Sequence, residues 1–249
     1  LFDATIIKIL KEKKAVMIGK TTLDELAMGG TGTTGHKGMT YNPYDESHTR
    51  LVGGSSCGSA AAVAASIVPF ALGSDTGDSV RKPASFAGLV GMKPTWGRIS
   101  RFGLFPFAPS LDHVGYFTRN VDDAALALEI LAGRDEHDST SSAKPVDKYL
   151  SHVNDSIKGL KIAVLSDVVD SLSDGVTKEK FLASIEGLRK EGAIVDFVEF
   201  GRFSLISLYP TYMVISCAEA TSNNANLDGI KFGPYYDGKS YQDVMYQAR

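Results

Sequence analysis

Apolar residues recur along the chain with two alternating periods, one helical and one typical of strands. Helical spacing predicts helices at 6–10, 59–65, 121–132 and 178–190, and a further capped helix at 22–28. Short apolar or alternating runs predict strands at 15–19, 68–73, 160–165 and 193–200. Polar residues predict connections at 29–50 and 134–148. Strands that alternate with helices predict an α/β fold, in which helices flank a mixed β-sheet core.

The composition is typical of a globular protein and excludes several classes. The 249 residues are 43% hydrophobic and 22% charged, and the formal net charge is −3. A chain of this charge has no broad basic field that would hold RNA through phosphate contacts alone. No run approaches the roughly 20 apolar residues that cross a bilayer, and the first residues lack the sections of a signal peptide. We therefore expect a cytoplasmic protein with no membrane partner.

Cysteine and histidine usage indicates neither a metal site nor a disulfide framework. Cys57 and Cys217 are the only cysteines and show no CxxC or Cys/His spacing, and the five histidines are scattered. We therefore expect no metal site in this chain.

Two Gly- and Ser-rich segments, 53–59 and 73–79, carry the candidate chemistry, and we call them the first and second serine loops. They flank one predicted helix and one predicted strand, so both can return to the same place in space. Both present hydroxyls and backbone N–H groups, which suits either anion binding at a helix N-terminus or acyl transfer with an oxyanion hole. On composition alone, a pair of structural turns fits equally well.

Two common catalytic motifs are missing from the sequence. The phosphate-loop spacing G-x-x-x-x-G-K-[ST] does not occur, and no lysine directly follows either glycine cluster. The G-x-S-x-G nucleophile elbow is also missing, and no His/Asp pair completes a conventional triad. If a serine attacks a substrate here, we expect its base not to be a histidine.

The segment from 53 to 98 reads GGSSCGSAAAVAASIVPFALGSDTGDSVRKPASFAGLVGMKPTWGR. It resembles the signature of the amidase signature family, usually written around GGSSGGS and D-[TI]-GGSIR. The resemblance implies a Ser/cis-Ser/Lys triad that hydrolyses amides, with the nucleophile at Ser79 and the cis-Ser at Ser55, 24 positions upstream. It also implies an oxyanion hole formed by the backbone N–H groups of Thr76, Gly77, Asp78 and Ser79.

In such a triad a buried, neutral lysine accepts a proton, because desolvation lowers the pKa of an ammonium group. A serine hydroxyl both donates and accepts hydrogen bonds, so Ser55 would relay the proton from Ser79 to the lysine and later to the leaving amine. The family's lysine lies in a K-D-N segment, which this sequence does not contain. Lys20 and Lys93 match other segments of the family, which we interpret as structural.

The ends of the sequence bear on this missing lysine. The chain starts without a methionine and stops at Arg249 without a cap or tail. This predicts that residues 1–249 are the central part of a single amidase-signature domain, truncated at both ends. Without the K-D-N lysine, we expect this fragment to be inactive.

Two positions in the serine loops depart from the family pattern, since Cys57 and Asp78 stand where the family usually has Gly. If either position needs a positive φ, a side chain there costs stability. Asp78 also puts negative charge near the oxyanion. Cys57 has no base beside it in the sequence and fits a small, packed residue better than a nucleophile. We expect Arg81 and Asp75 to brace the loop as an ion pair.

Four further segments resemble one branch of the family, the A subunits of glutamyl-tRNA(Gln) amidotransferases. They begin at Gly19, Gly97, Arg134 and Ala218. This resemblance implies a glutaminase subunit that hydrolyses glutamine and supplies ammonia for converting Glu-tRNA(Gln) to Gln-tRNA(Gln). It implies B and C subunits as partners and no cofactor in this chain. ATP and Mg are used by the B subunit, and Glu-tRNA(Gln) is reached only through that subunit.

One residue outside the signature is a candidate for substrate binding. Tyr212 falls near a position implicated in glutamine binding in this branch, although a packed aromatic fits it as well. Two other functions stay open. One is a stand-alone amidase that acts on a small carboxamide, and the other is a non-catalytic structural subunit that keeps the fold for assembly.

Overall fold

The computed structural model describes residues 2–232 and 234–248. Its internal contacts divide the chain into two compact units, Leu1–Val153 with Ile215–Arg249, and Asn154–Val214. We call these the first and second units and describe each by itself.

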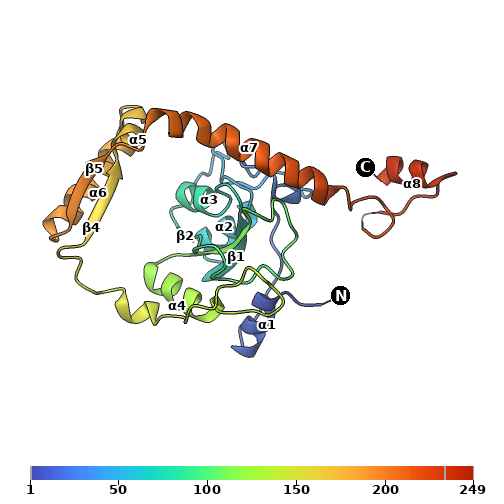
Figure 1. The fold of residues 1–249 in the computed structure, drawn as a ribbon, viewed down its shortest axis with the longest axis horizontal. Coiled ribbons are helices and arrows are strands. Elements are labelled where there is room, and N and C mark those ends of the chain that lie inside the picture. Colours follow the sequence, from blue (N-terminus) through green and yellow to red (C-terminus); the bar gives the residue numbers. More distant parts are fainter. Residues whose placement is uncertain (1, 233, 249) are drawn as a thin grey trace. The chain divides into compact units, whose positions relative to one another are not determined.

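An antiparallel sheet forms the centre of the first unit (Figure 1). Its strands are β1 (Phe70–Asp75), β2 (Val90–Met92) and β3 (His113–Thr118), and their order is β1–β3–β2. Phe70 and Val90 both stand opposite Thr118, and Asp75 stands opposite His113. The register therefore places the end of β1, which leads into the rest of the second serine loop, beside the start of β3.

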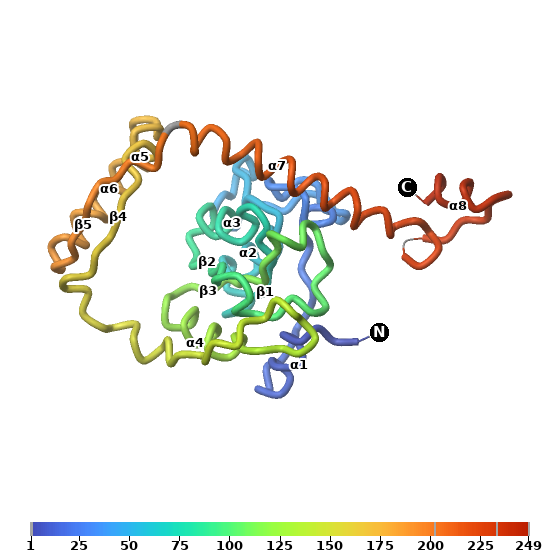
Figure 2. Tube along the Cα trace, in the orientation of Figure 1, coloured from blue at the N-terminus to red at the C-terminus, as the bar shows by residue number. Residues whose placement is uncertain are grey.

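Helices cover both faces of this sheet. Side chains alternate between the two faces along each strand, and apolar side chains on both faces need to be covered. Helices α2 (Cys57–Ala64) and α3 (Arg81–Phe86) pack on one face, around the buried residues Val52, Val63, Val80 and Phe117. Helices α1 (Thr5–Glu12) and α4 (Val121–Leu131) pack on the other, around Val114, Tyr116, Leu128 and Leu131. Figure 2 traces these two helical layers on opposite sides of the sheet.

Helix α2 consists of small residues, CGSAAAVA, and this lets a loop segment lie directly on its backbone. The N–H of Gly58 donates to Thr22 O at 3.1 Å, and a Cβ added at Gly58 would lie 2.6 Å from that same oxygen. Glycine is therefore required at this close approach.

The second unit is built on a parallel pair of strands, β4 (Lys161–Leu165) and β5 (Ile194–Val198). Parallel strands need a crossover connection, and α5 (Ser166–Ser171) and α6 (Val176–Lys190) supply it. The small core of this unit consists of Val164, Val169, Ile185, Ala193 and Val195.

The remaining elements are two 3-10 turns and two helices. The turns are η1 (Glu25–Ala27) and η2 (Tyr149–His152). Helix α7 (Arg202–Asn224) contains Pro210 and contributes residues to both units, and α8 (Tyr241–Ala248) follows it. Within 2–232 and 234–248, no helix combines the length and the apolar character that crossing a membrane requires.

The predicted α/β class is confirmed, together with most of the predicted elements. The four periodic segments predicted as helices at 6–10, 59–65, 121–132 and 178–190 match α1, α2, α4 and α6. The strands predicted at 68–73, 160–165 and 193–200 match β1, β4 and β5. The two kinds of strand pairing occur in separate sheets, antiparallel in the first unit and parallel in the second. The pattern did not predict the strands β2 and β3 or the helices α3, α5, α7 and α8.

Two predicted elements are wrong. Residues 15–19 form no strand and are exposed, with Val16 at 85%. A short apolar run becomes a strand only where another strand pairs its backbone groups, and no described strand does so here. Residues 22–28 form only η1, because Leu26 and Ala27 adopt φ of 54° and 58°, outside the right-handed helical region.

Candidate active site

Backbone and side-chain hydrogen bonds of Ser56 join the two serine loops. The N–H of Ser56 donates to Ser79 O at 3.1 Å. The Ser56 hydroxyl donates to Ser74 O and accepts from Ser74 N–H, both at 3.2 Å. The two loops therefore meet in space, as their spacing around one helix and one strand predicts.

Ser55, the neighbour of Ser56, has a different environment. The Gly54–Ser55 peptide bond is cis, as the family resemblance implies. Ser55 is fully buried, and its carbonyl accepts from Asp24 N–H at 3.0 Å. Its hydroxyl, however, has no hydrogen-bond partner among the described residues. A buried hydroxyl without a partner costs about 1–3 kcal/mol, which is rare unless the group serves a function.

The Asp24 carboxylate holds the segment that lies over the first serine loop. It accepts hydrogen bonds from the N–H groups of Thr31, Gly32 and Thr34 at 2.9–3.1 Å and from the Thr34 hydroxyl at 2.8 Å. Burial alone would raise the pKa of Asp24, but these hydrogen bonds lower it below its ordinary value. A Cβ at Gly54 would lie 2.0 Å from Asp24 Oδ2, so only glycine fits before Ser55.

Ser79 and its preceding residues present unused polar groups. Ser79 is 7% exposed, and its hydroxyl makes no hydrogen bond within the described part of the chain. The same holds for the backbone N–H groups of Gly77, Asp78 and Ser79, none of which donates to a described acceptor. Successive free N–H groups in a turn form a concavity that suits an anion. The second serine loop therefore has the groups that an oxyanion hole requires.

An ion pair braces the second serine loop, which confirms the expected contact between Asp75 and Arg81. The Arg81 guanidinium binds the Asp75 carboxylate, with Nη2 to Oδ1 at 2.8 Å, and also donates to Gly77 O. Asp75 also accepts from the N–H groups of Val80 and Arg81 at 3.0 and 3.2 Å. Burial would raise the pKa of Asp75, but the hydrogen bonds from Arg81 lower it below its ordinary value.

A second carboxylate, Asp112, fixes the loop from the other side, and the sequence pattern did not point to it. Asp112 accepts from the Thr76 hydroxyl at 2.6 Å and from the N–H groups of Phe107 and Ala108 at 2.9 and 3.0 Å. Its place directly before β3 was the available signal, because β3 lies beside β1. The Thr76 side chain is therefore held by Asp112.

Lys93 and His113 lie near the same end of the sheet. Lys93 Nζ donates to Pro94 O at 3.0 Å and lies 3.5 Å from His113 Nε2, while His113 Nδ1 donates to Leu111 O at 2.7 Å. Burial lowers the pKa of Lys93 below its ordinary value, and the charge of Arg81 lowers it further. Lys20, the other lysine that matches a family segment, lies in an exposed stretch.

The two residues that depart from the family pattern are accommodated without backbone strain. Neither Cys57 nor Asp78 has a positive φ. Cys57 is fully buried, and its thiol contacts the Thr40 hydroxyl and Thr22 O at 3.4 and 3.8 Å. These neighbours include no general base, which supports a packing role. Asp78 forms an ion pair with Lys82 at 2.9 Å.

Tyr212 belongs to α7 and to the second unit, whereas both serine loops belong to the first. Its ring centroid lies 6.4 Å from that of Tyr209. Its role in binding substrate stays a prediction.

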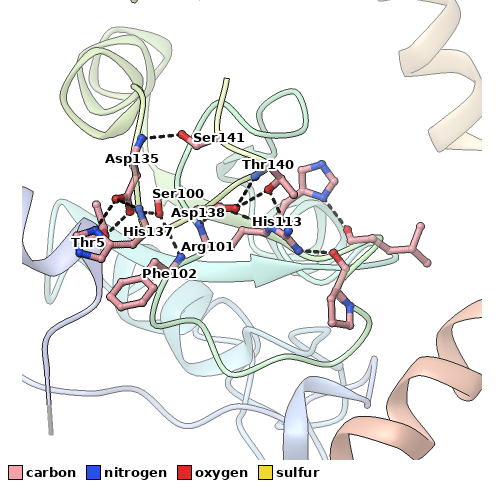
Figure 3. Close-up of polar contacts among 12 residues, drawn as sticks. Thr5, Ser100, Arg101, Phe102, His113, Asp135, His137, Asp138, Thr140 and Ser141 are labelled. Carbon is pink, nitrogen blue, oxygen red and sulfur yellow. Dashed lines mark hydrogen bonds and ion pairs between the residues drawn. The ribbon is translucent and has the colours of Figure 1, made fainter. Parts of the chain in front are cut away.

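A separate polar cluster, which we call the Asp135/Asp138 cluster, lies between the 97–103 segment and the 134–141 loop (Figure 3). Asp135 accepts from the hydroxyls of Thr5 and Ser100, both at 2.5 Å, and from His137 N–H at 2.9 Å. Asp138 accepts from Arg101 N–H at 2.8 Å. A cavity of about 320 Å³ lies beside this cluster and is also lined by Asp112. Within the described residues, no group of three or more His, Cys, Asp or Glu side chains could hold a metal ion.

Comparisons with known proteins agree with this geometry. The chain is 44% identical to the A subunit of the glutamyl-tRNA(Gln) amidotransferase of Staphylococcus carnosus and 48% identical to that of Staphylococcus saprophyticus, in each case over 99% of this chain and 50% of the relative. The crystal structure of the corresponding Thermotoga maritima protein matches with a TM-score of 0.84 and 45% identity, over 90% of this chain and 49% of that one. A peptide amidase from Stenotrophomonas maltophilia matches with a TM-score of 0.79 and 33% identity, over 90% and 47%.

The chain thus spans about half the length of the relatives that it matches. The family model described as Amidase covers residues 1–249. Together with the matching solved structures, this shows that the chain belongs to the amidase family.

Proposed function

We propose that this chain carries the serine chemistry of a glutaminase subunit of a tRNA-dependent amidotransferase. Ser79 is the nucleophile, Ser55 is the proton relay, and the N–H groups of Thr76, Gly77 and Asp78 form the oxyanion hole. The observation that supports this proposal is the pattern of hydrogen bonds in the two serine loops. They are hydrogen-bonded to each other, yet the hydroxyls of Ser55 and Ser79 and the N–H groups of Gly77 and Asp78 have no described partner.

The proposed reaction transfers an acyl group twice. The Ser79 oxygen attacks the side-chain amide carbon of glutamine, and the hydroxyl proton moves through Ser55 to a base. The tetrahedral intermediate bears its negative charge on oxygen, where the loop's N–H groups stabilise it. The C–N bond then breaks, and the proton returns to the leaving nitrogen, so that ammonia departs and a glutamyl ester remains on Ser79. Water hydrolyses this ester to glutamate and restores the serine.

The hydrogen bonds of the adjacent serines favour Ser55 over Ser56 as the relay. The Ser56 hydroxyl is engaged on both sides by Ser74, so it is not available to accept and pass a proton. The Ser55 hydroxyl is buried and uncommitted. A relay group must be able to form new hydrogen bonds to both the nucleophile and the base, and of the two only Ser55 meets this condition.

The names of the relatives support an A subunit of a glutamyl-tRNA(Gln) amidotransferase, an enzyme with further subunits. Within this proposal, glutamine is the amide donor and B and C subunits are the partners. ATP, Mg and Glu-tRNA(Gln) would all bind to the B subunit, so that this chain itself needs no cofactor. Tyr212 is proposed to contact glutamine, and the cytoplasm is the proposed location.

A stand-alone amidase acting on a small carboxamide is the second candidate. It is favoured by the likeness to a peptide amidase, which shares the fold at 33% identity. The identity to amidotransferase A subunits, 44% and 48% over almost the whole chain, favours the first candidate. Ammonia release from glutamine that rises when B and C subunits are added would distinguish the two.

Covalent labelling tests the nucleophile. We expect that the full gene product, exposed to a glutamine-derived electrophile, carries the adduct on Ser79, as located by mass spectrometry of its peptides. Ser79→Ala should abolish both the adduct and ammonia release and leave the circular dichroism spectrum unchanged. An adduct on Cys57 in the wild-type protein would overturn the assignment.

A further inference from the structure

Two carboxylates precede Ser79 within four residues, and each is paired with a cation of α3. Asp75, at the end of β1, binds Arg81 at 2.8 Å, and Asp78 binds Lys82 at 2.9 Å. The Asp75 pair is explained by the loop brace described above. The Asp78 pair has no such structural role, because Asp78 is half exposed and bonds nothing else through its side chain within the described residues.

Asp78 has two opposing effects on an anion in the proposed oxyanion hole. Its backbone N–H is one of the proposed donors, and this N–H donates to no described acceptor. Its side chain carries a negative charge one residue before the nucleophile. A like charge close to a developing oxyanion opposes the reaction, and each tenfold loss of rate corresponds to about 1.4 kcal/mol of such repulsion. The Asp78 charge therefore needs a counter-charge.

Lys82 is positioned to supply that charge. Its N–H donates to Asp78 O at 2.8 Å, which places the two residues one helical turn apart and brings their side chains to the same side. The Lys82 ammonium lies against the backbone of the 29–34 segment, because a Cβ at Gly30 would lie only 2.7 Å from Nζ. The side chain of Lys82 is 29% exposed, so it is partly shielded from water.

From these contacts we propose that Lys82 is a positioning residue of the reaction, which neutralises Asp78 so that the second serine loop can hold an anion. This inference rests on the proposed function. The charges cancel within each of the two ion pairs, Asp75 with Arg81 and Asp78 with Lys82. A further cation, Lys93, interacts with the charges of the first pair. An ordinary surface ion pair would contribute little to stability and nothing to the rate.

The test measures ammonia release by the full gene product with glutamine. Lys82→Met should lower kcat by about tenfold and leave KM nearly unchanged, because the lost interaction acts on the charged intermediate. Lys82→Gln, a second variant, should do the same, and Lys82→Arg should keep most of the activity. The unfolding midpoint in urea should stay at the wild-type value in all three. Added salt should reduce the loss in Lys82→Met, because it screens the uncompensated carboxylate.

A second-site change decides whether Lys82 acts through Asp78. Asp78→Asn in the Lys82→Met background keeps the backbone N–H but removes the charge that Lys82 neutralises, so kcat should rise severalfold above that of Lys82→Met alone. Lys178→Met is the matched control, since Lys178 forms an ion pair of the same spacing with Asp174 in the second unit. It should leave kcat unchanged.

The outcomes separate the two proposals. Wild-type kcat in Lys82→Met and Lys82→Gln, or a double variant without recovery, would overturn the role of Lys82 while the proposed function stands. Ammonia release that persists in Ser79→Ala, measured in parallel, would overturn the proposed function and this inference with it.

Discussion

The Asp135/Asp138 cluster and the serine loops both bury polar side chains in the first unit, but their hydrogen bonds differ. In the cluster, the oxygens of both carboxylates are occupied, and the one buried atom without a described hydrogen-bond partner is Arg101 Nε, which lies 3.9 Å from Asp138 Oδ2. Thr5, Ser100 and His137 donate to Asp135, and Arg101 and Thr140 donate to Asp138. In the serine loops, by contrast, the Ser55 hydroxyl is buried without a described partner, and the N–H groups of 77–79 donate to no described acceptor. Saturated groups hold a structure together, whereas unsaturated groups are available to a substrate.

This difference separates function from support within the serine loops themselves. Ser56, Asp75 and Asp112 are saturated and join the loop to its surroundings. Ser55 and Ser79 lie beside them with uncommitted hydroxyls. The loops therefore consist of a rigid frame and a small set of reactive groups, which is the arrangement that positioned catalysis needs.

The largest expected effect concerns the base, which the sequence does not supply in its K-D-N form. Residues 1–249 expressed alone should release ammonia from glutamine several orders of magnitude more slowly than the full gene product, because a protonated serine attacks poorly. Lys93→Met is the informative control, since Lys93 is a partly buried lysine with a lowered pKa close to the loop. Rapid turnover by 1–249 that Lys93→Met abolishes would identify Lys93 as the base.

The next effect compares the adjacent serines in the full gene product. Ser55→Ala should lower glutaminase turnover by about 10²–10⁴ and leave stability unchanged or raised, because it removes an unpaired buried hydroxyl. Ser56→Ala should lower the free energy of unfolding by about 1 kcal/mol through loss of the Ser74 hydrogen bonds, with a smaller effect on turnover. Ammonia assays and urea unfolding measure both. The reverse ranking would assign the proton relay to Ser56.

Acid should lower the free energy of unfolding, because it protonates the hydrogen-bonded carboxylates. The folded-state pKa values of Asp24, Asp75, Asp135 and Asp138 are all lowered, so the unfolded chain binds protons before the folded one as the pH falls. Their contribution is fully present above about pH 3.9 and is lost below it, by at most about 1.4 kcal/mol per pH unit for each proton. Urea unfolding at pH 7, 4 and 3 measures this. Unfolding free energies that stay level from pH 4 to pH 3 would contradict it.

The smallest expected effect tests the cluster alone. Asp135→Asn replaces an acceptor oxygen by an NH₂ group that faces existing donors, so the free energy of unfolding should fall by about 1–3 kcal/mol. Asp122→Asn, at an exposed position in the first turn of α4, should cost only about 0.5 kcal/mol. Ammonia release per folded molecule should not change in either variant. A lower kcat in Asp135→Asn would assign the cluster a part in the reaction.

Most local elements could be predicted because they depend on neighbouring residues. The periodic segments of α4 and α6 and the apolar runs of β1 and β4 were recognised at nearly their observed bounds. The strand predicted at 15–19 was wrong, because pairing depends on a distant strand. The helix predicted at 22–28 was wrong because Leu26 and Ala27 adopt a positive φ, which a right-handed helix does not allow.

The sequence by itself determined the two serine loops, the 24-residue spacing between Ser55 and Ser79, and the family resemblance, since all of these are properties of residue order. Only the tertiary structure decided which polar groups are satisfied. Ser56 is held by Ser74, Thr76 by Asp112, and the Ser55 hydroxyl by no side chain or backbone group that the structure describes. Those partners lie 18 and 36 positions away, and hydrogen-bond saturation depends on neighbours in space.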